Sequence, residues 1–331
     1  MRVLVVKMSS LGDVIHTLPA LTDAARALPG IRFDWVVEEA FAEIPAWHPA
    51  VDRVIPVALR RWRKRPLQSL RGPEWKQARN ALRQRQYDAV IDAQGLVKSA
   101  FIAGQVKAPR HGMDRRTARE GLAASVYHHR VHVPRDMHAV ERIRLLFSRA
   151  LHYRLAPGPG DYGVREALSH HAHSLPPGLL LFHGTARPEK LWPRESWVEF
   201  GELAVAQGYR LWLPWGNEQE QQRAGWIAGR LPGAEVLPRL DLQELAGMLL
   251  GVSGAVAVDT GLGHLSAALA VPTVSLYGPT STRLVGAYGR NQVHIQSPLG
   301  ATDTSDPRAM MRAILAPAVW RELRAILPGA G

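Results

Sequence analysis

Short apolar strands alternate with helix-like segments along most of this chain of 331 residues. This alternation is typical of parallel sheets covered by helices on both faces, because parallel strands need crossover connections of helix length. We expect strands over residues 3–6, 33–37, 51–57 and 89–92 in the first half, and over 179–182, 209–213, 235–237, 255–258 and 273–277 in the second. The predicted fold class is α/β, with two doubly wound, Rossmann-like parallel-sheet domains.

Helical spacing of apolar residues predicts the connections between these strands. The expected helices cover residues 13–28, 75–85, 99–106, 196–207, 218–228 and 242–250, and another begins at 264. Glycines and prolines within 157–177 indicate a linker. We therefore expect a first domain over 1–160, a second over 161–306, and a C-terminal helix within 307–331 that packs back across the domains. Ligands of such sheets lie at the carboxyl ends of the strands, so a cleft between the domains is the expected site.

Composition narrows the class of protein. Hydrophobic residues make up 46% of the chain and charged residues 21%, which is ordinary for a soluble globular protein. Cysteine is absent, which excludes disulfides, thiolate metal ligands and thiol nucleophiles. The apolar run at the N-terminus is too short for a signal peptide, and the longest uncharged apolar stretch, 245–258, is too short to span a bilayer. These features predict a cytoplasmic protein.

The strand expected at 255–258 leads directly into a glycine-rich turn, Asp259-Thr-Gly-Leu-Gly-His264, which opens a helix. Free N–H groups and the helix dipole favour an anion at such a helix start. Gly261 and Gly263 allow a ligand to approach the backbone closely. Asp259, Thr260 and His264 add a carboxylate, a hydroxyl and an imidazole. A phosphate-bearing ligand with hydroxyls fits this turn, although similar turns also occur for structural reasons alone.

A second polar turn, residues 8–14 (MSSLGDV), follows the first expected strand. It contains a single glycine, so the G-x-G-x-x-G fingerprint is missing and a nicotinamide enzyme is not expected. Ser9, Ser10 and Asp13 are common helix-capping residues, and a helix cap is one interpretation. The alternative is that Asp13 acts as a carboxylate base at the mouth of the cleft, kept ionised by the helix N-terminus.

The loop after the strand expected at 179–182 contains Thr185 and Lys190. A hydroxyl and a mobile cation suit a diphosphate that gains negative charge as a leaving group. A solvated loop is the alternative interpretation. Two phosphate-suited turns in the same half of the chain favour a functional site over either turn alone.

The net charge of +12 favours an anionic partner, and nucleic acid, an anionic membrane surface and an acidic substrate are the candidates. Many of the cations fall in one stretch: Arg60, Arg61, Arg63, Lys64, Arg65, Arg71, Lys76, Arg79, Arg83 and Arg85. The tight run 60–65 predicts a loop that faces an anionic surface or a multiply charged acceptor, whereas the helix 75–85 has a solvated face. Zinc-finger, RNP and basic-zipper motifs are missing, which argues against nucleic acid. His128, His129, His132 and His138 lack metal-ligand spacing, so no metal site is expected.

Three of these segments together resemble one family. Residues 7–20 (KMSSLGDVIHTLPA), 185–193 and 259–264 are similar in order and spacing to the lipopolysaccharide heptosyltransferase I family, and the resemblance covers nearly the whole chain. It implies a GT-B fold and an inverting glycosyltransferase that uses no metal or other cofactor. The implied reaction transfers L-glycero-D-manno-heptose from ADP-heptose to the first Kdo of Kdo2-lipid A. The resemblance further implies peripheral contact with the anionic inner face of the bacterial inner membrane, and no nucleic-acid partner.

The resemblance also assigns roles to individual residues. Asp13 would be the general base for the acceptor hydroxyl. The residues implied to bind the donor are Thr185, Lys190, Glu220, Leu240, Asp259, Thr260, Gly261 and His264. Those implied to bind the acceptor are Arg60, Arg63, Lys64, Lys98 and Arg119. The sequence departs from the family pattern at Ala186, where a second threonine is expected, so one hydrogen bond to the diphosphate is in doubt.

Two other functions remain compatible with the sequence. The chain could be a GT-B transferase for another sugar nucleotide, such as heptosyltransferase II, or a related epimerase, and a panel of donors separates these. It could instead be a nucleotide- or nucleic-acid-binding protein that uses the basic face. A steep salt dependence of nucleic-acid binding would support that interpretation.

Overall fold

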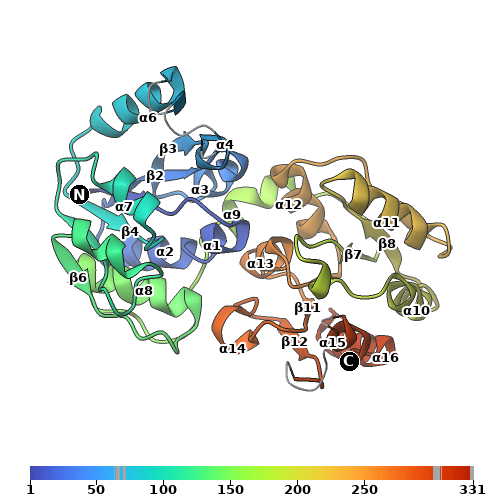
Figure 1. Cartoon of the computed structure of the whole chain (residues 1–331). Coiled ribbons are helices and arrows are strands. Elements are labelled where there is room, and N and C mark those ends of the chain that lie inside the picture. The colour runs from blue at the N-terminus through green and yellow to red at the C-terminus, as the bar shows by residue number, and fades with distance from the viewer. Residues whose placement is uncertain (63, 65–67, 70–71, 301–305, 307, 329–331) are drawn as a thin grey trace. The chain divides into compact units, whose positions relative to one another are not determined.

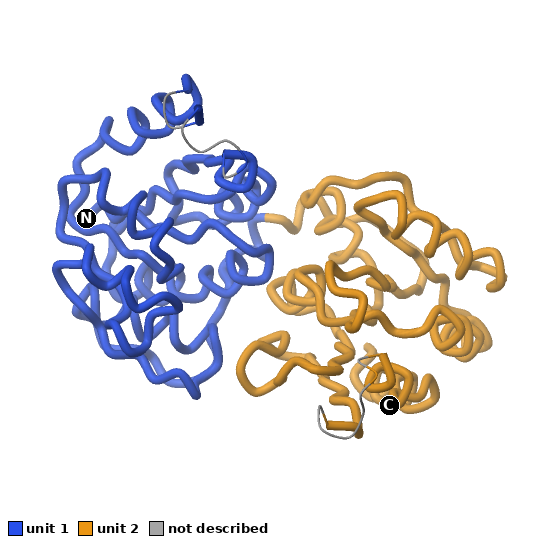
Figure 2. The backbone as a smooth tube through the Cα atoms, viewed as in Figure 1, with its two compact units in different colours: residues 1–167 blue, residues 168–331 orange. Residues whose placement is uncertain are grey.

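The computed structural model describes residues 1–62, 64, 68–69, 72–300, 306 and 308–328. The chain forms two compact units, unit 1 (Met1–Ala167) and unit 2 (Leu168–Gly331), which Figure 2 shows in different colours. The boundary falls within helix α9 (Arg165–Leu168), whereas the sequence predicts a boundary after residue 160. Each unit contains a six-stranded sheet.

All strands of unit 1 are parallel, in the order β3-β2-β1-β4-β5-β6 (Figure 1). They are β1 (Arg2–Val6), β2 (Arg32–Glu38), β3 (Val51–Val57), β4 (Ala89–Asp92), β5 (Arg110–Met113) and β6 (His129–Val131). The central strand β1 pairs with β2 on one side and with β4 on the other. The direction in which strands are added reverses between β1 and β4, which makes the carboxyl ends of these two strands a topological switch point.

Helices and short 3₁₀ turns connect the strands of unit 1. They are α1 (Leu11–Ile15), α2 (Leu18–Ala27), η1 (Glu39–Phe41), α3 (Glu43–Ala46), α4 (Leu59–Trp62), α6 (Pro73–Arg83), α7 (Val97–Ala103), η2 (Gly121–Val126) and α8 (Ala139–Ala150). Helix α8 packs against α2, and the buried Arg144 on α8 donates to Asp23 on α2 over 2.7 Å. The same guanidinium donates to the carbonyl of Gly158, so it also holds the segment that leaves the unit.

Unit 2 repeats this plan, with parallel strands in the order β12-β11-β10-β7-β8-β9. They are β7 (Gly178–Phe182), β8 (Arg210–Leu213), β9 (Ala234–Val236), β10 (Gly254–Val258), β11 (Thr273–Tyr277) and β12 (Gln292–Gln296). Strands β7, β10 and β11 are buried throughout, as expected for central parallel strands. The switch point of this sheet lies between β7 and β10.

The connections of unit 2 are η3 (Ser169–His171), η4 (Pro188–Lys190), α10 (Arg194–Val205), α11 (Glu218–Ala228), α12 (Leu242–Gly251), α13 (Gly261–Ala268), α14 (Thr282–Val285), α15 (Ala309–Arg312) and α16 (Ala316–Ile326). The tail helix α16 packs against α10, β11 and β12. Trp192, just before α10, and Trp197, on α10, lie fully buried in the core of unit 2. Throughout the described residues, every helix is too short or too polar to cross a bilayer.

Two features differ from the sequence expectations. The single helix expected over 13–28 is split into α1 and α2 at His16 and Thr17. Pro19 explains the break, because it has no N–H for the Ile15 carbonyl and its ring clashes with a continuous helix. In addition, β5, β6, α8, α14 and β12 were not expected from the sequence, and residues 60–62 of the run expected as a loop belong to helix α4.

Candidate functional site

The carboxyl end of β1 in unit 1 carries Asp13, the predicted base, in the first helical turn of α1. Asp13 Oδ2 accepts hydrogen bonds from the backbone N–H of Ser10 at 2.9 Å and from its hydroxyl at 3.1 Å. Lys7 Nζ lies 3.5 Å from Asp13 Oδ1, and Arg119 Nη1 lies 3.9 Å from Asp13 Oδ2. The carboxylate is therefore part of a helix cap and is surrounded by cations, so the two sequence interpretations of Asp13 are compatible.

These neighbours control the charge of Asp13. Burial alone would raise the pKa of the carboxyl, but the Lys7 charge, the Ser10 N–H, His16 and Arg119 together lower it to about 2. Asp13 is thus ionised at neutral pH. Its side chain is 29% exposed, so a hydroxyl group can reach it, whereas the Lys7 side chain is only 6% exposed.

Gln94, just after β4, forms hydrogen bonds across the switch point with the loop between β1 and Asp13. Its Oε1 accepts from the backbone N–H groups of Met8 and Ser9, at 2.9 and 3.2 Å, and its Nε2 donates to the Ser9 carbonyl at 2.8 Å. Lys7 Nζ donates to the carbonyl of Ala93 at 3.1 Å. The loop after β4 therefore sets the position of the loop that carries the candidate base. Sequence analysis missed Gln94, because one glutamine in a short loop has no pattern that marks it.

Asp92, the last residue of β4, fixes the loop that follows this strand. Its carboxylate accepts from the Tyr127 hydroxyl and the Ser99 hydroxyl, both at 2.7 Å, and from the N–H groups of Gln94 and Gly95 at 2.9 and 3.0 Å. Burial raises the pKa of Asp92, and these four hydrogen bonds partly oppose the rise. Gly95 has φ of +68°, a left-handed conformation that favours glycine.

In unit 2, the two turns that follow β7 and β10 meet at the switch point. Thr185 Oγ1 donates to the Asp259 carbonyl at 3.0 Å, and Lys190 Nζ lies 2.6 Å from Asp259 Oδ2. The side chains of Lys190 and Asp259 are 14% and 10% exposed, so the pair is largely withdrawn from water. The structure thus brings together three residues predicted from two separate motifs. Ala186, where a second threonine was expected, is exposed.

Helix α13 begins at this turn, with Thr260 as its extended N-cap residue and Gly261 as its first residue. Gly263 packs closely on β10, since a Cβ at Gly263 would lie 3.2 Å from Ala257 Cβ. His264 is buried one turn into the helix. The helix N-terminus and the Lys190 side chain place positive charge beside the Asp259 carboxylate, as an anion site requires.

Glu220 lies beside the first of these turns, at the start of α11. Its backbone N–H donates to the Asn217 side chain at 3.0 Å, and its Oε2 accepts from the Gly216 N–H at 2.8 Å. The carboxylate packs on Gly184, where an added Cβ would lie 2.6 Å from Glu220 Cδ. Leu240 is half-buried just before Asp241, the N-cap residue of α12.

The predicted acceptor residues lie on two parts of unit 1. Lys98 on α7 and Arg119 are both exposed, and Arg119 belongs to the Asp13 cluster. Arg60 and Lys64 lie at and just after α4, where Arg60 lies over the Phe41 ring at 5.2 Å. Arg63 is outside the described residues.

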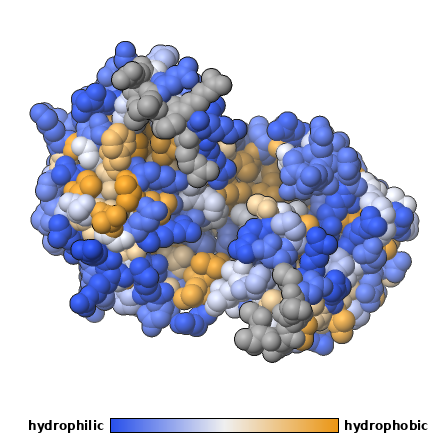
Figure 3. All heavy atoms as spheres, viewed as in Figure 1, coloured by the Kyte–Doolittle hydropathy of each residue, from blue (hydrophilic) through white to orange (hydrophobic). Residues whose placement is uncertain are grey.

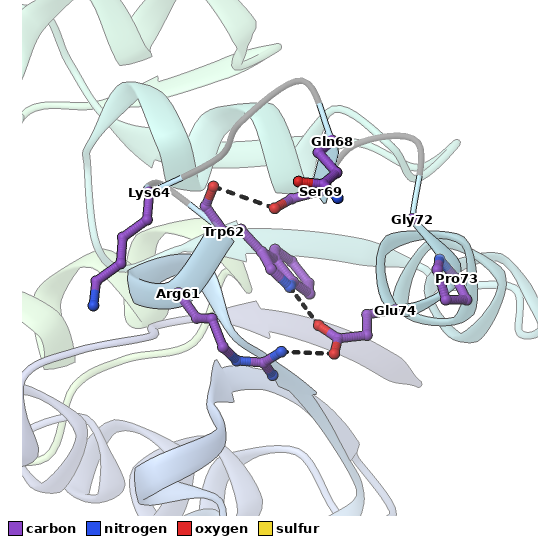
Figure 4. Close-up of a pocket in the computed structure, with 8 residues that line it drawn as sticks. All are labelled: Arg61, Trp62, Lys64, Gln68, Ser69, Gly72, Pro73 and Glu74. Carbon is purple, nitrogen blue, oxygen red and sulfur yellow. Dashed lines mark hydrogen bonds and ion pairs between the residues drawn. The ribbon is translucent and has the colours of Figure 1, made fainter.

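A cavity of about 370 Å³ lies between α4 and the start of α6 (Figure 4). It is lined by Arg61, Trp62, Lys64, Gln68, Ser69, Gly72, Pro73 and Glu74. Glu74 accepts from Arg61 at 2.6 Å and from the Trp62 indole N–H at 2.7 Å, which joins the two walls. In Figure 4, the Lys64 side chain points away from Arg61 and Glu74, so the edge of the cavity carries a cation.

Within the part of the chain that the structure describes, His, Asp and Glu side chains do not gather in a group of three or more that could hold a metal ion. His128, His129 and His132 lie exposed near the edge strand β6, and His138 is half-buried as the N-cap residue of α8. The first three therefore lie on the surface of unit 1, whereas His138 is part of a helix cap.

Comparison with known proteins places this chain among characterised sequences. Residues 75–313 match the model for glycosyltransferase family 9 (heptosyltransferase). The chain is 57% identical over 299 residues to lipopolysaccharide heptosyltransferase 1 of Pseudomonas aeruginosa, a match that covers 90% of this chain and 84% of that protein. The solved structure of E. coli heptosyltransferase WaaC with ADP has 45% identity and a TM-score of 0.92, over 98% of this chain and 100% of that one. The same E. coli protein with ADP-2-deoxy-2-fluoro heptose has 44% identity and a TM-score of 0.88, over 98% and 99%.

Proposed function

The chain belongs to glycosyltransferase family 9, the heptosyltransferases, and we propose that it transfers L-glycero-D-manno-heptose from ADP-heptose to the first Kdo of Kdo2-lipid A. The observation that carries this proposal is the anion site of unit 2. There Lys190, the start of α13 and Asp259 meet after two neighbouring strands. The E. coli relative solved with ADP and with a fluorinated ADP-heptose supports ADP-heptose as the donor.

In the proposed reaction, the acceptor hydroxyl oxygen attacks the anomeric carbon while the bond from that carbon to the diphosphate breaks, which inverts the configuration. Negative charge grows on the departing ADP. The Lys190 ammonium and the N-terminus of α13 stabilise that charge, so the reaction needs no metal ion. Thr260, Gly261 and His264 hold the diphosphate, Asp259 binds heptose hydroxyls, and Glu220 binds the ribose. Leu240 lies against the adenine.

In this proposal, Thr185 has a structural role besides the donor contact that the family resemblance implies. Its hydroxyl already donates to the Asp259 carbonyl at 3.0 Å, so it joins the two turns that form the donor site. It can donate to a phosphate oxygen only by giving up this bond, because a hydroxyl has one proton to donate. The backbone N–H of Ala186 is then available for the hydrogen bond that a second threonine would otherwise provide.

Asp13 takes the proton of the attacking hydroxyl in this proposal. A carboxylate with a pKa of about 2 is always ionised at neutral pH, but it has low proton affinity. The proton therefore moves only as the new carbon–oxygen bond forms and the hydroxyl becomes acidic. Precise positioning of Asp13 matters more for such a base than its intrinsic strength.

The acceptor is multiply anionic, and unit 1 carries the cations that suit it. Arg119 lies beside the base, and together with Lys98 on α7 it would meet Kdo carboxylates. Arg60, Arg63 and Lys64 would meet the phosphates of lipid A. The same basic surface supports a peripheral location on the anionic cytoplasmic face of the inner membrane.

The direct test is mass-spectrometric detection of heptose transfer from ADP-heptose to Kdo2-lipid A. Wild type should form the product, and Asp13→Ala should bind ADP-heptose normally while losing nearly all turnover. Asp52→Ala is the matched control, because Asp52 is a surface aspartate of unit 1 that also pairs with arginines. Substantial residual turnover in Asp13→Ala would remove Asp13 as the base.

A panel of sugar nucleotides tests the donor separately. Efficient transfer from a donor other than ADP-heptose would replace the proposed substrate but keep the transferase. Undiminished activity after chelation of divalent cations is expected, and a chelator-sensitive reaction would contradict the role given to Lys190 and α13.

A further inference from the structure

Three of the five large hydrophobic side chains that are strongly exposed in the described chain lie on two neighbouring elements of unit 1. Val97 and Phe101 on α7 are 49% and 46% exposed, and Leu122 on η2 is 69% exposed. Val97 and Phe101 are four residues apart, so they share one side of the helix, and α7 packs against η2. We call these three side chains the apolar face. Figure 3 shows apolar side chains gathered over the part of unit 1 where Figure 1 labels α7, with hydrophilic side chains around them.

The apolar face is anchored in the core of unit 1. The Phe101 ring stacks on Trp75 with centroids 5.4 Å apart, and Trp75 contacts Trp62 edge-on at 6.0 Å. Both tryptophans are buried. Phe101 therefore has a fixed position although about half of its surface is exposed, and a rigid apolar side chain loses little entropy when it is covered.

Exposed cations border this face. Lys98 follows Val97 on α7, Arg119 precedes Leu122 by three residues, and Arg79 lies one helical turn after Trp75 on α6. The acidic groups close by are engaged in hydrogen bonds within the unit. Glu120 accepts from the Val97 N–H at 2.7 Å, and Glu74 accepts from Arg61 and Trp62. Glu74 is neutralised by its ion pair with Arg61, so the three cations outnumber the Glu120 carboxylate and the border has a net positive charge.

We propose that the apolar face and its cations form the surface on which the protein sits on an anionic lipid bilayer. Apolar side chains surrounded by Lys and Arg suit the boundary between acyl chains and anionic headgroups. The inference rests on the proposed lipid-linked acceptor and specifies how the enzyme reaches it. Arg119 connects the surface to the catalytic centre, because its guanidinium lies 3.9 Å from Asp13 while its own loop leads to Leu122. A bilayer at this face presents its acceptor sugars beside the base.

A second copy of the chain fits the face less well. A symmetric dimer through this surface places the same patch on both sides of the interface. The cations around Val97 and Leu122 would then face the cations of the other copy, and like charges across an interface are unfavourable. The net charge of +12 adds to this repulsion.

The test measures co-sedimentation of the full chain with vesicles of phosphatidylcholine that contain about 30% phosphatidylglycerol. The double variant Val97→Gln/Leu122→Gln should reduce the partition coefficient about tenfold, because it removes two side chains that would be buried on binding. Leu315→Gln in unit 2 is the matched control, since Leu315 is 65% exposed and lies outside the face. It should bind as wild type does. Arg79→Glu should weaken binding to these vesicles and leave the small affinity for pure phosphatidylcholine unchanged.

Heptose transfer to a deacylated, water-soluble acceptor separates this inference from the proposed function. The double variant should match wild type with that acceptor and lose activity only with acceptor embedded in vesicles. Failure of wild type on the soluble acceptor would contradict the proposed function, whereas wild-type vesicle binding by the double variant would contradict the docking surface. A wild-type dimer that the double variant dissociates in sedimentation velocity would likewise overturn it, in favour of a second copy as the occupant.

Discussion

The side-chain amide of Gln94 binds both backbone groups of Ser9. Its Oε1 accepts from the Ser9 N–H at 3.2 Å, and its Nε2 donates to the Ser9 carbonyl at 2.8 Å. Gln94 follows β4, whereas Ser9 follows β1, so one side chain joins the two central strands where the sheet switches direction. Ser10, the next residue, donates to Asp13. The position of the proposed base thus depends on an amide that does not contact it in the described structure.

Gln94→Ala should lower kcat by about 10- to 100-fold and leave the KM for ADP-heptose unchanged, because it removes three hydrogen bonds that position the Asp13 loop. The donor site lies in unit 2, so donor affinity is a control within the same experiment. Steady-state kinetics with both substrates varied makes the measurement. Gln105→Ala is the matched control, since the Gln105 amide makes an exposed bond to the Phe101 carbonyl.

A double variant separates positioning from general damage to unit 1. If Gln94 acts through Asp13, Gln94→Ala should cause little further loss of the residual rate in an Asp13→Ala background. A full multiplicative loss in the double variant would mean that Gln94 has a separate role. Unfolding midpoints of all three variants show whether the unit remains folded.

Lys7→Met should move the acid limb of the kcat/KM profile to higher pH. In the wild type, Lys7 is the largest of the influences that lower the pKa of Asp13, to about 2, against a burial effect that raises it. Without the Lys7 charge, less opposes the effect of burial, so the pKa of Asp13 rises. The variant should therefore lose activity in mildly acidic buffer where wild type does not, as a pH profile on the soluble acceptor will show. Identical acid limbs would mean that another group controls the profile.

The strongly apolar parts of the fold could be predicted from the sequence, and polar contacts across the chain could not. The strand 273–277 was predicted with the observed bounds, because it is a short, largely apolar run that is buried throughout. The helix 218–228 was also predicted with the observed bounds, although most of its residues are polar. β5 (Arg110–Met113) and β6 (His129–Val131) were missed, because they are short and contain Arg and His instead of an apolar run. The helix α8 has clear apolar spacing, so it could have been predicted from the sequence.

In the candidate site, too, single residues could be predicted from the sequence, but contacts between them could not. Motifs indicated Asp13, Lys190 and Asp259 individually, because the polar segments that follow strands lie at the carboxyl edge of a sheet. Spacing could not indicate that Lys190 and Asp259 form an ion pair, since 69 residues separate them. Gln94 could not be predicted for the same reason, because its partners lie 85 and 86 residues earlier.

Because Lys190 pairs with Asp259, substitutions of the two residues should have non-additive effects on the stability of unit 2. Either Lys190→Met or Asp259→Asn leaves one charge with little access to water and without its partner, so each should lower the stability of unit 2 by about 1–3 kcal/mol. The double variant should be less destabilised than the sum of the two. Donor affinity should fall in all three variants, most in those that lack Lys190. Denaturant unfolding and titration with ADP give both quantities, and strictly additive stabilities would mean that the pair contributes no coupling.

Gly184→Ala should raise the KM for ADP-heptose with little change in kcat. An added Cβ would lie 2.6 Å from Glu220 Cδ and 2.7 Å from Oε1, so the carboxylate proposed to bind the ribose has to move. Gly225→Ala is the matched control on the same helix, since its added Cβ has nothing within 4 Å. Gly225→Ala should stabilise α11 by about 0.5–1 kcal/mol and leave donor binding unchanged. An unchanged KM in Gly184→Ala would remove Glu220 from the donor site.

His48 should make unit 1 sensitive to mild acid. Burial lowers the pKa of His48 to about 4, against a smaller opposite influence from Asp161, and its ordinary value is 6.5. Its Nδ1 accepts from the Ala50 N–H at 3.2 Å, which places the ring proton on Nε2, 2.9 Å from the Thr22 hydroxyl. Protonation of Nδ1 would break the first of these bonds, so the folded state favours the neutral ring.

The sign of the pH dependence follows from these two pKa values. Between them the unfolded chain binds a proton at His48 and the folded chain does not, so unfolding is favoured as the pH falls. The stabilisation is complete above about pH 6.5, and about 3 kcal/mol of it is lost by about pH 4. Hydrogen exchange of peptides that cover residues 18–27 and 43–51, corrected for the intrinsic rate, measures the loss. His48→Gln should flatten this dependence at the cost of lower stability at neutral pH, whereas the same substitution of the exposed His170 should leave it unchanged. An equal slope in His48→Gln and wild type would assign the acid sensitivity to another group.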